Sequence, residues 1–118
     1  MGRMRSCKDL EVWQKSIELV SEIYRVTRQF PKEEQFGLVG QMRRSAVSIP
    51  SNIAEGYMRQ YDKELAQFLH VALGSCGELD TQIIIAERLG YLGTEHEITE
   101  RIDHIGRMLR NLAKCLKE

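Results

Sequence analysis

Apolar residues recur every three or four positions along most of this chain, which is the spacing of one face of an α-helix. The first such stripe comprises Leu10, Trp13, Ile17, Val20 and Tyr24. It predicts a helix from about Asp9, the expected N-cap, to Arg28. A second apolar strip beside it contains Val12, Leu19, Ile23 and Val26. This surface is wider than one small core needs, so we expect it either to cover a neighbouring subunit or to make a two-sided contact within one bundle.

The second helix is predicted from Lys32–Gln35 to about Arg59, after Pro31 has ended the first helix. Its apolar stripe contains Val39, Met42, Ala46, Ile49, Ile53 and Tyr57. Pro50 lies inside this helix. A proline lacks the amide that would bond to the carbonyl four residues earlier, and its ring crowds that carbonyl, so we expect a kink.

A break at Pro50 is the alternative to a kink. Asn52 and Glu55 have the spacing of a capping box, which would start a new helix directly after the proline. The apolar stripe nevertheless keeps its phase on both sides of Pro50. This continuous phase favours one kinked helix over two separate helices.

A third helix is predicted from about Lys63 to Leu89, with Asp62 as its N-cap. Its core stripe contains Leu65, Leu69, Ala72, Cys76, Leu79 and Ile83. The three isoleucines at 83–85 make the helix apolar almost all round. We therefore expect that segment to be buried on several sides, either at the centre of the bundle or in a subunit interface.

Two glycines, Gly90 and Gly93, are expected to form the C-cap of the third helix and the turn after it. Thr94 and Glu97 have the spacing of a capping box and predict the start of a fourth helix. The stripe of this helix contains Ile98, Ile102, Ile105, Leu109, Leu112 and Leu116.

Four amphipathic helices with short connections and no strand-like run predict an all-α fold. The expected architecture is an antiparallel up-down-up-down four-helix bundle with its second helix kinked at Pro50. The 118 residues are enough for one domain. We expect a short basic tail at residues 1–8 and the bundle domain at residues 9–118.

The overall charge does not call for a nucleic-acid partner, because the formal net charge is zero. Residues 1–60 hold ten Lys/Arg and seven Asp/Glu, whereas residues 61–118 hold seven and ten. A basic binding face must therefore come from local clustering or from oligomer symmetry. The absence of a signal-like segment or a membrane-length apolar run predicts a cytoplasmic protein with no membrane contact.

Known catalytic and metal-binding motifs do not occur in the sequence. Di-iron bundles use Glu-x-x-His pairs, but Glu100 and His104 are four residues apart. The sequence also lacks a nucleophile elbow, a P-loop and a dinucleotide fingerprint. Three cysteines occur without metal-ligand spacing, and Cys76 and Cys115 are expected to be buried on apolar helix faces. We expect no enzymatic activity, no metal and no cofactor.

Polar residues on the second and third helices could meet inside the bundle. The candidates are Ser48, Asn52, Glu55, Ser75 and Glu78. One interpretation is a buried hydrogen-bond network that sets how the helices align, since buried polar groups need partners. The other is a ligand pocket lined by the same side chains. The network is the favoured interpretation.

Basic residues form the remaining candidate site. We expect Arg43, Arg44, Arg59 and Lys63 to contact nucleic acid, with Arg43 and Arg44 as the leading pair. A single cluster of this kind is usually a solvated face. Repeated around a ring of identical subunits, it becomes a multivalent surface for phosphates.

Three segments closely resemble the bacterial four-helix-bundle proteins encoded within intervening sequences of 23S ribosomal RNA genes. They are DLEVWQKSIELV at 9–20, QMRRSAVSIPSNIAEGY at 41–57 and ELAQFLHVALGSCGELDTQIIIAERLGYL at 64–92. The resemblance covers about residues 9–115. Family members commonly carry leucine at the position of Cys76. The motif residues that carry over are Arg43, Arg44, Ser48, Pro50, Asn52, Glu55, Gly56, Ser75 and Glu78.

The resemblance implies an antiparallel four-helix bundle that assembles as a homopentamer around a central channel. That fold is similar to the accessory variability determinant protein of diversity-generating retroelements, a basic pentamer that binds nucleic acid and a reverse transcriptase. The neutral charge of this chain departs from that basic relative. Our leading hypothesis is a non-enzymatic oligomer that binds structured RNA or a ribonucleoprotein through backbone phosphates. The alternative is a protein-interaction scaffold that binds no nucleic acid.

Overall fold

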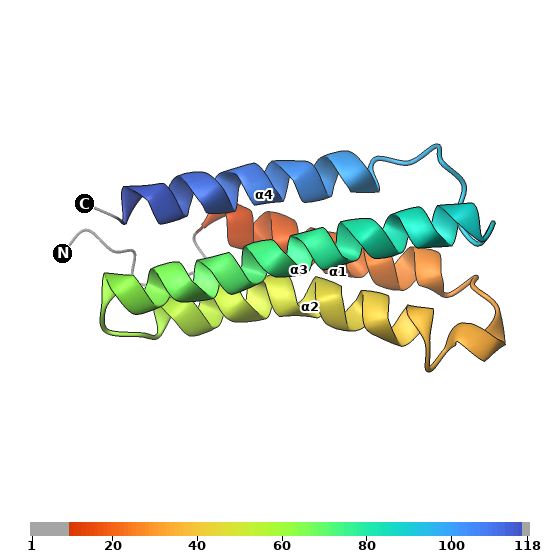
Figure 1. The fold of residues 1–118 in the computed structure, drawn as a ribbon, viewed down its shortest axis with the longest axis horizontal. Helices are drawn as coiled ribbons and strands as arrows, with labels where there is room; N and C mark the ends of the chain where they lie inside the picture. The colour runs from red at the N-terminus through yellow and green to blue at the C-terminus, as the bar shows by residue number, and fades with distance from the viewer. Residues whose placement is uncertain (1–9, 117–118) are drawn as a thin grey trace.

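The structure is a computed structural model that describes residues 10–116. Within that range the chain forms four α-helices, one short 3-10 helix and no strand. The elements are α1 (Glu11–Thr27), η2 (Lys32–Glu34), α2 (Leu38–Tyr57), α3 (Asp62–Arg88) and α4 (Ile98–Cys115). Successive α-helices run in opposite directions along a bundle 48 Å long (Figure 1). The predicted all-α, up-down-up-down four-helix fold is confirmed.

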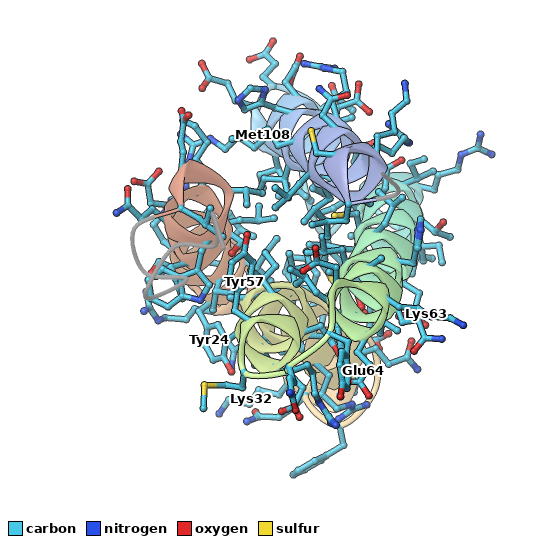
Figure 2. The ribbon with its side chains drawn as sticks, turned by 90° about the vertical axis from the view of Figure 1, so that its left-hand side faces the viewer. Tyr24, Lys32, Tyr57, Lys63, Glu64 and Met108 are labelled. Atoms are coloured by element: carbon cyan, nitrogen blue, oxygen red, sulfur yellow. The ribbon has the colours of Figure 1, made fainter. Side chains whose placement is uncertain are left out.

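The core lies along the shared axis of the four helices, where their apolar stripes meet (Figure 2). The largest fully buried side chains are Leu19, Ile23, Met42, Ile49, Ile53, Leu65, Leu69, Leu79, Ile83, Ile98, Ile105 and Leu109. They come from every α-helix. On α2, α3 and α4 they follow the predicted stripes, whereas on α1 they belong to the second apolar strip and not to the first. Burial of these stripes is the main force that holds the helices together, because short helices are marginal alone in water.

Helix α2 continues through Pro50, whose side chain is buried. The alternative of a break at Pro50 is therefore wrong, the favoured single helix is confirmed, and its kink remains a prediction. The helix starts at Leu38, later than predicted, because the preceding Gly37 lies outside the helical region with φ −108° and ψ −110°. The segment that was expected to begin this helix forms the separate 3-10 helix η2.

The two predicted side-chain caps in the described part of the chain are wrong. Asp62 is the first residue of α3 and not its cap. The N-cap of α3 is Tyr61, whose side chain makes no capping hydrogen bond. The Thr94–Glu97 capping box does not form, because α4 starts only at Ile98. The Ile98 amide instead donates to Nδ1 of His96, so an imidazole fills the role of the cap. The predicted cap Asp9 and the basic tail at 1–8 lie outside the described residues.

The end of α3 agrees with the prediction. Gly90 has a φ of +81°, which is the left-handed conformation that a residue without a Cβ adopts without strain. Its amide donates to the Glu87 carbonyl at 3.1 Å, and the Tyr91 amide donates to the Ala86 carbonyl at 2.9 Å. This pair of bonds is a Schellman motif, and it turns the chain toward α4.

The two described cysteines differ in environment. Cys76 is buried in the core, and its burial raises the pKa of the thiol from 9.0 to about 11. It is therefore a protonated, unreactive thiol at neutral pH. Cys115 is exposed near the end of α4, so the prediction of a buried thiol there is wrong.

The isoleucine run at 83–85 is only partly buried within one chain. Ile83 is 0% exposed, whereas Ile84 and Ile85 are 45% and 42% exposed. Burial on several sides is therefore not achieved inside a single bundle. On α1 the second apolar strip is the one that faces the core, through Leu19 and Ile23, whereas Ile17 and Tyr24 of the first predicted stripe are partly exposed. No helix in the described range is long and apolar enough to span a membrane.

Helices α2 and α3 approach closely near the turn that joins them. A Cβ placed on Gly56 would lie 2.8 Å from Cδ1 of Leu65 and 3.0 Å from Cβ of Phe68. Both distances are too short for ordinary carbon contacts. The glycine thus permits this close packing, which explains its place in the motif.

Candidate functional site

Arg43, the first of the leading pair, is held against α1. Its Nε donates to Thr27 Oγ1 at 2.9 Å, and its NH2 group donates to the Tyr24 carbonyl at 3.3 Å. Its guanidinium also lies 4.4 Å from the centre of the Tyr24 ring. These contacts join α2 to the last turn of α1, where a cation is favoured by the helix dipole. The structure therefore gives Arg43 a part in the packing of the bundle.

Arg44 is exposed on α2 and borders two grooves. One groove, of about 580 Å³, lies between α1 and α2 and includes Tyr24, Val39 and Val47. The other, of about 250 Å³, lies between α2 and α3 and includes Ser48 and Glu78. An exposed guanidinium between two open grooves is accessible to a phosphate.

Arg59 and Lys63 lie around the turn from α2 to α3. Arg59 donates to Glu55 at 2.8 Å and stacks on the Phe68 ring at 4.8 Å. Lys63 is exposed and points away from the bundle (Figure 2). Arg44 and Arg59 are separated by about 20 Å along α2, at 1.5 Å per residue. The four predicted cations therefore form two separate groups on one subunit.

The structure brings together three of the five predicted network residues. The hydroxyls of Ser48 on α2 and Ser75 on α3 are 2.8 Å apart. The Asn52 amide donates to the Ser48 hydroxyl at 2.9 Å and to the Ser48 carbonyl at 2.8 Å. The Ser75 side chain is buried, and the bond with Ser48 supplies the partner that its hydroxyl needs.

The two predicted carboxylates lie elsewhere. Glu55 is exposed and forms an ion pair with Arg59 one turn later in the chain. Glu78 is exposed at the rim of the α2–α3 groove, near Arg44 and Gln82. Oε1 of Gln82 is buried there and has no hydrogen-bond partner in the structure. Within residues 10–116, no group of three His, Cys, Asp or Glu side chains could hold a metal ion.

Two features escaped the sequence analysis. Tyr91 donates to Glu34 at 2.9 Å and packs on Phe30 at 5.5 Å between ring centres, so it joins η2 to the chain after α3. The carboxylate of Glu34, which accepts this bond, raises the pKa of the Tyr91 phenol. These residues are far apart in sequence and follow no local motif.

The second missed feature is a basic groove between α3 and α4. It has a volume of about 330 Å³ and is lined by His70, Arg107, Arg110, Asn111, Ala113 and Lys114. The three cations on α4 are spaced three and four residues apart, which places them on one helix face. This spacing is the feature of the sequence that could have predicted the groove. The neutral overall charge gives no sign of this local basic cluster.

Replacing Arg43 with alanine is expected to lower the free energy of unfolding by about 1–2 kcal/mol, because two hydrogen bonds and a ring contact are lost. Arg44→Ala should change it by less than about 0.5 kcal/mol, since that side chain is exposed. Urea denaturation of the two variants measures both effects. Equal stability of the two variants would show that the contacts of Arg43 add nothing to the fold.

Two comparisons with known proteins cover most of the chain. The model of a family described as 23S rRNA-intervening sequence protein matches residues 8–111. A crystal structure from Bacteroides thetaiotaomicron superposes with a TM-score of 0.80 and 25% sequence identity, covering 87% of this chain and 95% of that chain. That structure is described as a protein of unknown function from the S23 ribosomal protein family. No curated protein matches the sequence.

Proposed function

This chain belongs to the 23S rRNA-intervening sequence protein family, and from that premise we propose that it binds structured RNA through backbone phosphates. It does so as a non-enzymatic homo-oligomer. The observation that carries the proposal is the display of exposed cations on the outer surface of α2, α3 and the turn between them, by Arg44, Lys63 and Arg59 respectively. Cations that project from rigid helices contact phosphates without reading base sequence.

The apolar surface supports the oligomeric part of the proposal. Ile84 and Ile85 on α3, together with Ile17 and Tyr24 on α1, remain partly exposed in the single chain. Apolar side chains of this size on rigid helices are typical of surfaces that meet another subunit. A homopentamer repeats each basic group five times, so weak phosphate contacts act together.

The test of RNA binding is fluorescence anisotropy of a labelled stem-loop RNA at several salt concentrations, with protein mass determined in the same buffers. We expect binding that weakens steeply with salt, because each phosphate contact releases counterions. The triple variant Arg44→Ala/Arg59→Ala/Lys63→Ala should bind at least about tenfold more weakly and with a shallower salt slope.

The matched control removes three other exposed cations, which lie at the end of the bundle opposite Arg59 and Lys63, in the variant Arg28→Ala/Arg88→Ala/Arg101→Ala. Arg101 pairs with Glu97 four residues earlier, as Arg59 pairs with Glu55, so the control also removes one ion pair. If the control keeps the parent affinity, the weaker binding of the triple variant comes from lost local contacts and not from the lower net charge alone. An intact oligomer that binds no RNA at low salt would refute the proposal.

A protein-interaction scaffold is the second candidate, and the exposed apolar side chains of α3 favour it. It predicts negligible RNA affinity and a protein partner that depends on Ile84 and Ile85. Pull-down from cell extract with the parent and with Ile84→Asp/Ile85→Asp distinguishes a partner bound at this surface from proteins that bind non-specifically. A partner retained equally by both proteins would count against this surface.

A further inference from the structure

The basic groove between α3 and α4 has the features of an anion-binding site. Its cations are Arg107, Arg110 and Lys114 on α4, and no carboxylate within residues 10–116 lines it. All three cations are exposed, so they keep their charge available to a ligand. An ion pair beside the groove joins Arg107 to Asp103 at 3.6 Å, and both side chains are largely exposed. Such a pair is weak and is easily exchanged for a phosphate.

The spacing of these cations matches a chain of phosphates better than a single anion. Arg107 and Lys114 are two helical turns apart, which is about 10 Å along α4. Lys63 extends this basic row, because it lies two turns before His70 on the same face of α3. The start of α3 and the end of α4 lie at the same end of the bundle (Figure 1). The row therefore follows the groove and continues to the α2–α3 turn.

The other lining residues suit a nucleobase. His70 is exposed on α3 and offers an aromatic ring across the groove from the cations. Asn111 has both a donor and an acceptor for the polar edge of a base. The groove volume of about 330 Å³ is at the small end of the range for organic ligands, and it fits one nucleotide unit at a time.

We propose that this groove binds an unpaired segment of RNA. Arg107, Arg110 and Lys114 contact successive phosphates, and one base stacks on the imidazole of His70. Unpaired bases are the parts of RNA that stack on protein side chains, whereas bases within a helix are inaccessible to such stacking. This inference rests on the proposed RNA binding and adds the structural class of the RNA and the groove that receives it.

The experiment compares a short labelled RNA without self-complementarity with the same RNA annealed to its complement. We expect the parent protein to bind the single strand more tightly. Arg110→Ala/Lys114→Ala should weaken single-strand binding at least about tenfold and reduce the salt slope by about 1.4, at about 0.7 per phosphate contact. His70→Ala should weaken it about tenfold, whereas His70→Phe should retain the parent affinity because it keeps the stacking surface.

The control Arg28→Ala/Arg88→Ala removes the same charge at the opposite end of the bundle. Circular dichroism melting verifies that each variant is folded. If the parent binds RNA and the groove variant matches this control, the groove inference alone is overturned. Equal affinity for single strand and duplex, or equal losses in His70→Ala and His70→Phe, would likewise overturn the unpaired-base inference alone. A parent protein that binds neither RNA would overturn the proposed function and this inference together.

Discussion

Replacing Ile83 with alanine is expected to lower the free energy of unfolding by about 3 kcal/mol, a large share of the stability of a domain of this size. The side chain is 0% exposed and belongs to the central core. Its truncation removes buried apolar surface and leaves a cavity that rigid helices fill only in part. Urea or thermal denaturation of dilute protein measures the loss, which should also lower the melting temperature by about 10 °C.

Ile84 provides the matched control, since it is the same residue in the next position of the same helix. It is 45% exposed, so Ile84→Ala should change the unfolding free energy of a dilute chain by about 0.5 kcal/mol or less. If Ile84 packs against a second subunit, its truncation should instead weaken association at higher protein concentration. Equal stability losses at the two positions would show that the burial difference along α3 is wrong.

The second large effect is expected at Gly56. The variant Gly56→Val should lower the free energy of unfolding by about 3 kcal/mol, because its side chain needs space that Leu65 and Phe68 occupy. Cβ alone would lie 2.8 Å and 3.0 Å from atoms of these residues. Helices α2 and α3 must then separate locally, and the side chains around Gly56 lose packing contacts on both helices.

Gly74 on α3 serves as the control for the loss of glycine itself. A Cβ on Gly74 would meet nothing within 4 Å. This residue lies in the middle of α3 and is exposed to solvent. Gly74→Val should therefore be neutral or slightly stabilising, because valine has a better helix propensity than glycine. Chemical denaturation of both variants tests the contrast. A neutral Gly56→Val would mean that α2 and α3 are not closely packed at this point.

The helical core could be predicted from the sequence because a single repeated signal specifies it. Apolar residues at steps of three and four, such as Met42, Ala46 and Ile49, must face the same side of a helix, and that side must be buried. The phase of this stripe across Pro50 likewise predicted one helix instead of two. These predictions needed no knowledge of long-range contacts.

Helix starts and the roles of polar side chains were less predictable, because each depends on a choice among competing partners. The Thr94–Glu97 spacing permits a capping box, yet the Ile98 amide bonds to His96 instead. Glu55 had Arg59 available four residues later, just past the end of its helix, and pairs with it outside the network. In the sequence Arg43 has no feature that distinguishes it from other surface cations. In the fold it contacts Thr27 and Tyr24 of α1. Local sequence patterns contain no information on such contacts between helices.

An even number of antiparallel helices brings the start of α1 and the end of α4 to one end of the bundle (Figure 1). The α3–α4 groove lies near that same end, so a tag fused to either terminus is tethered close to it. A circular permutant that joins the end of α4 to the start of α1 through a flexible linker and opens the exposed turn between Gly93 and Thr94 moves both ends to the opposite side. We expect this permutant to fold with the same helical content by circular dichroism. It would offer an unobstructed groove for immobilised binding measurements.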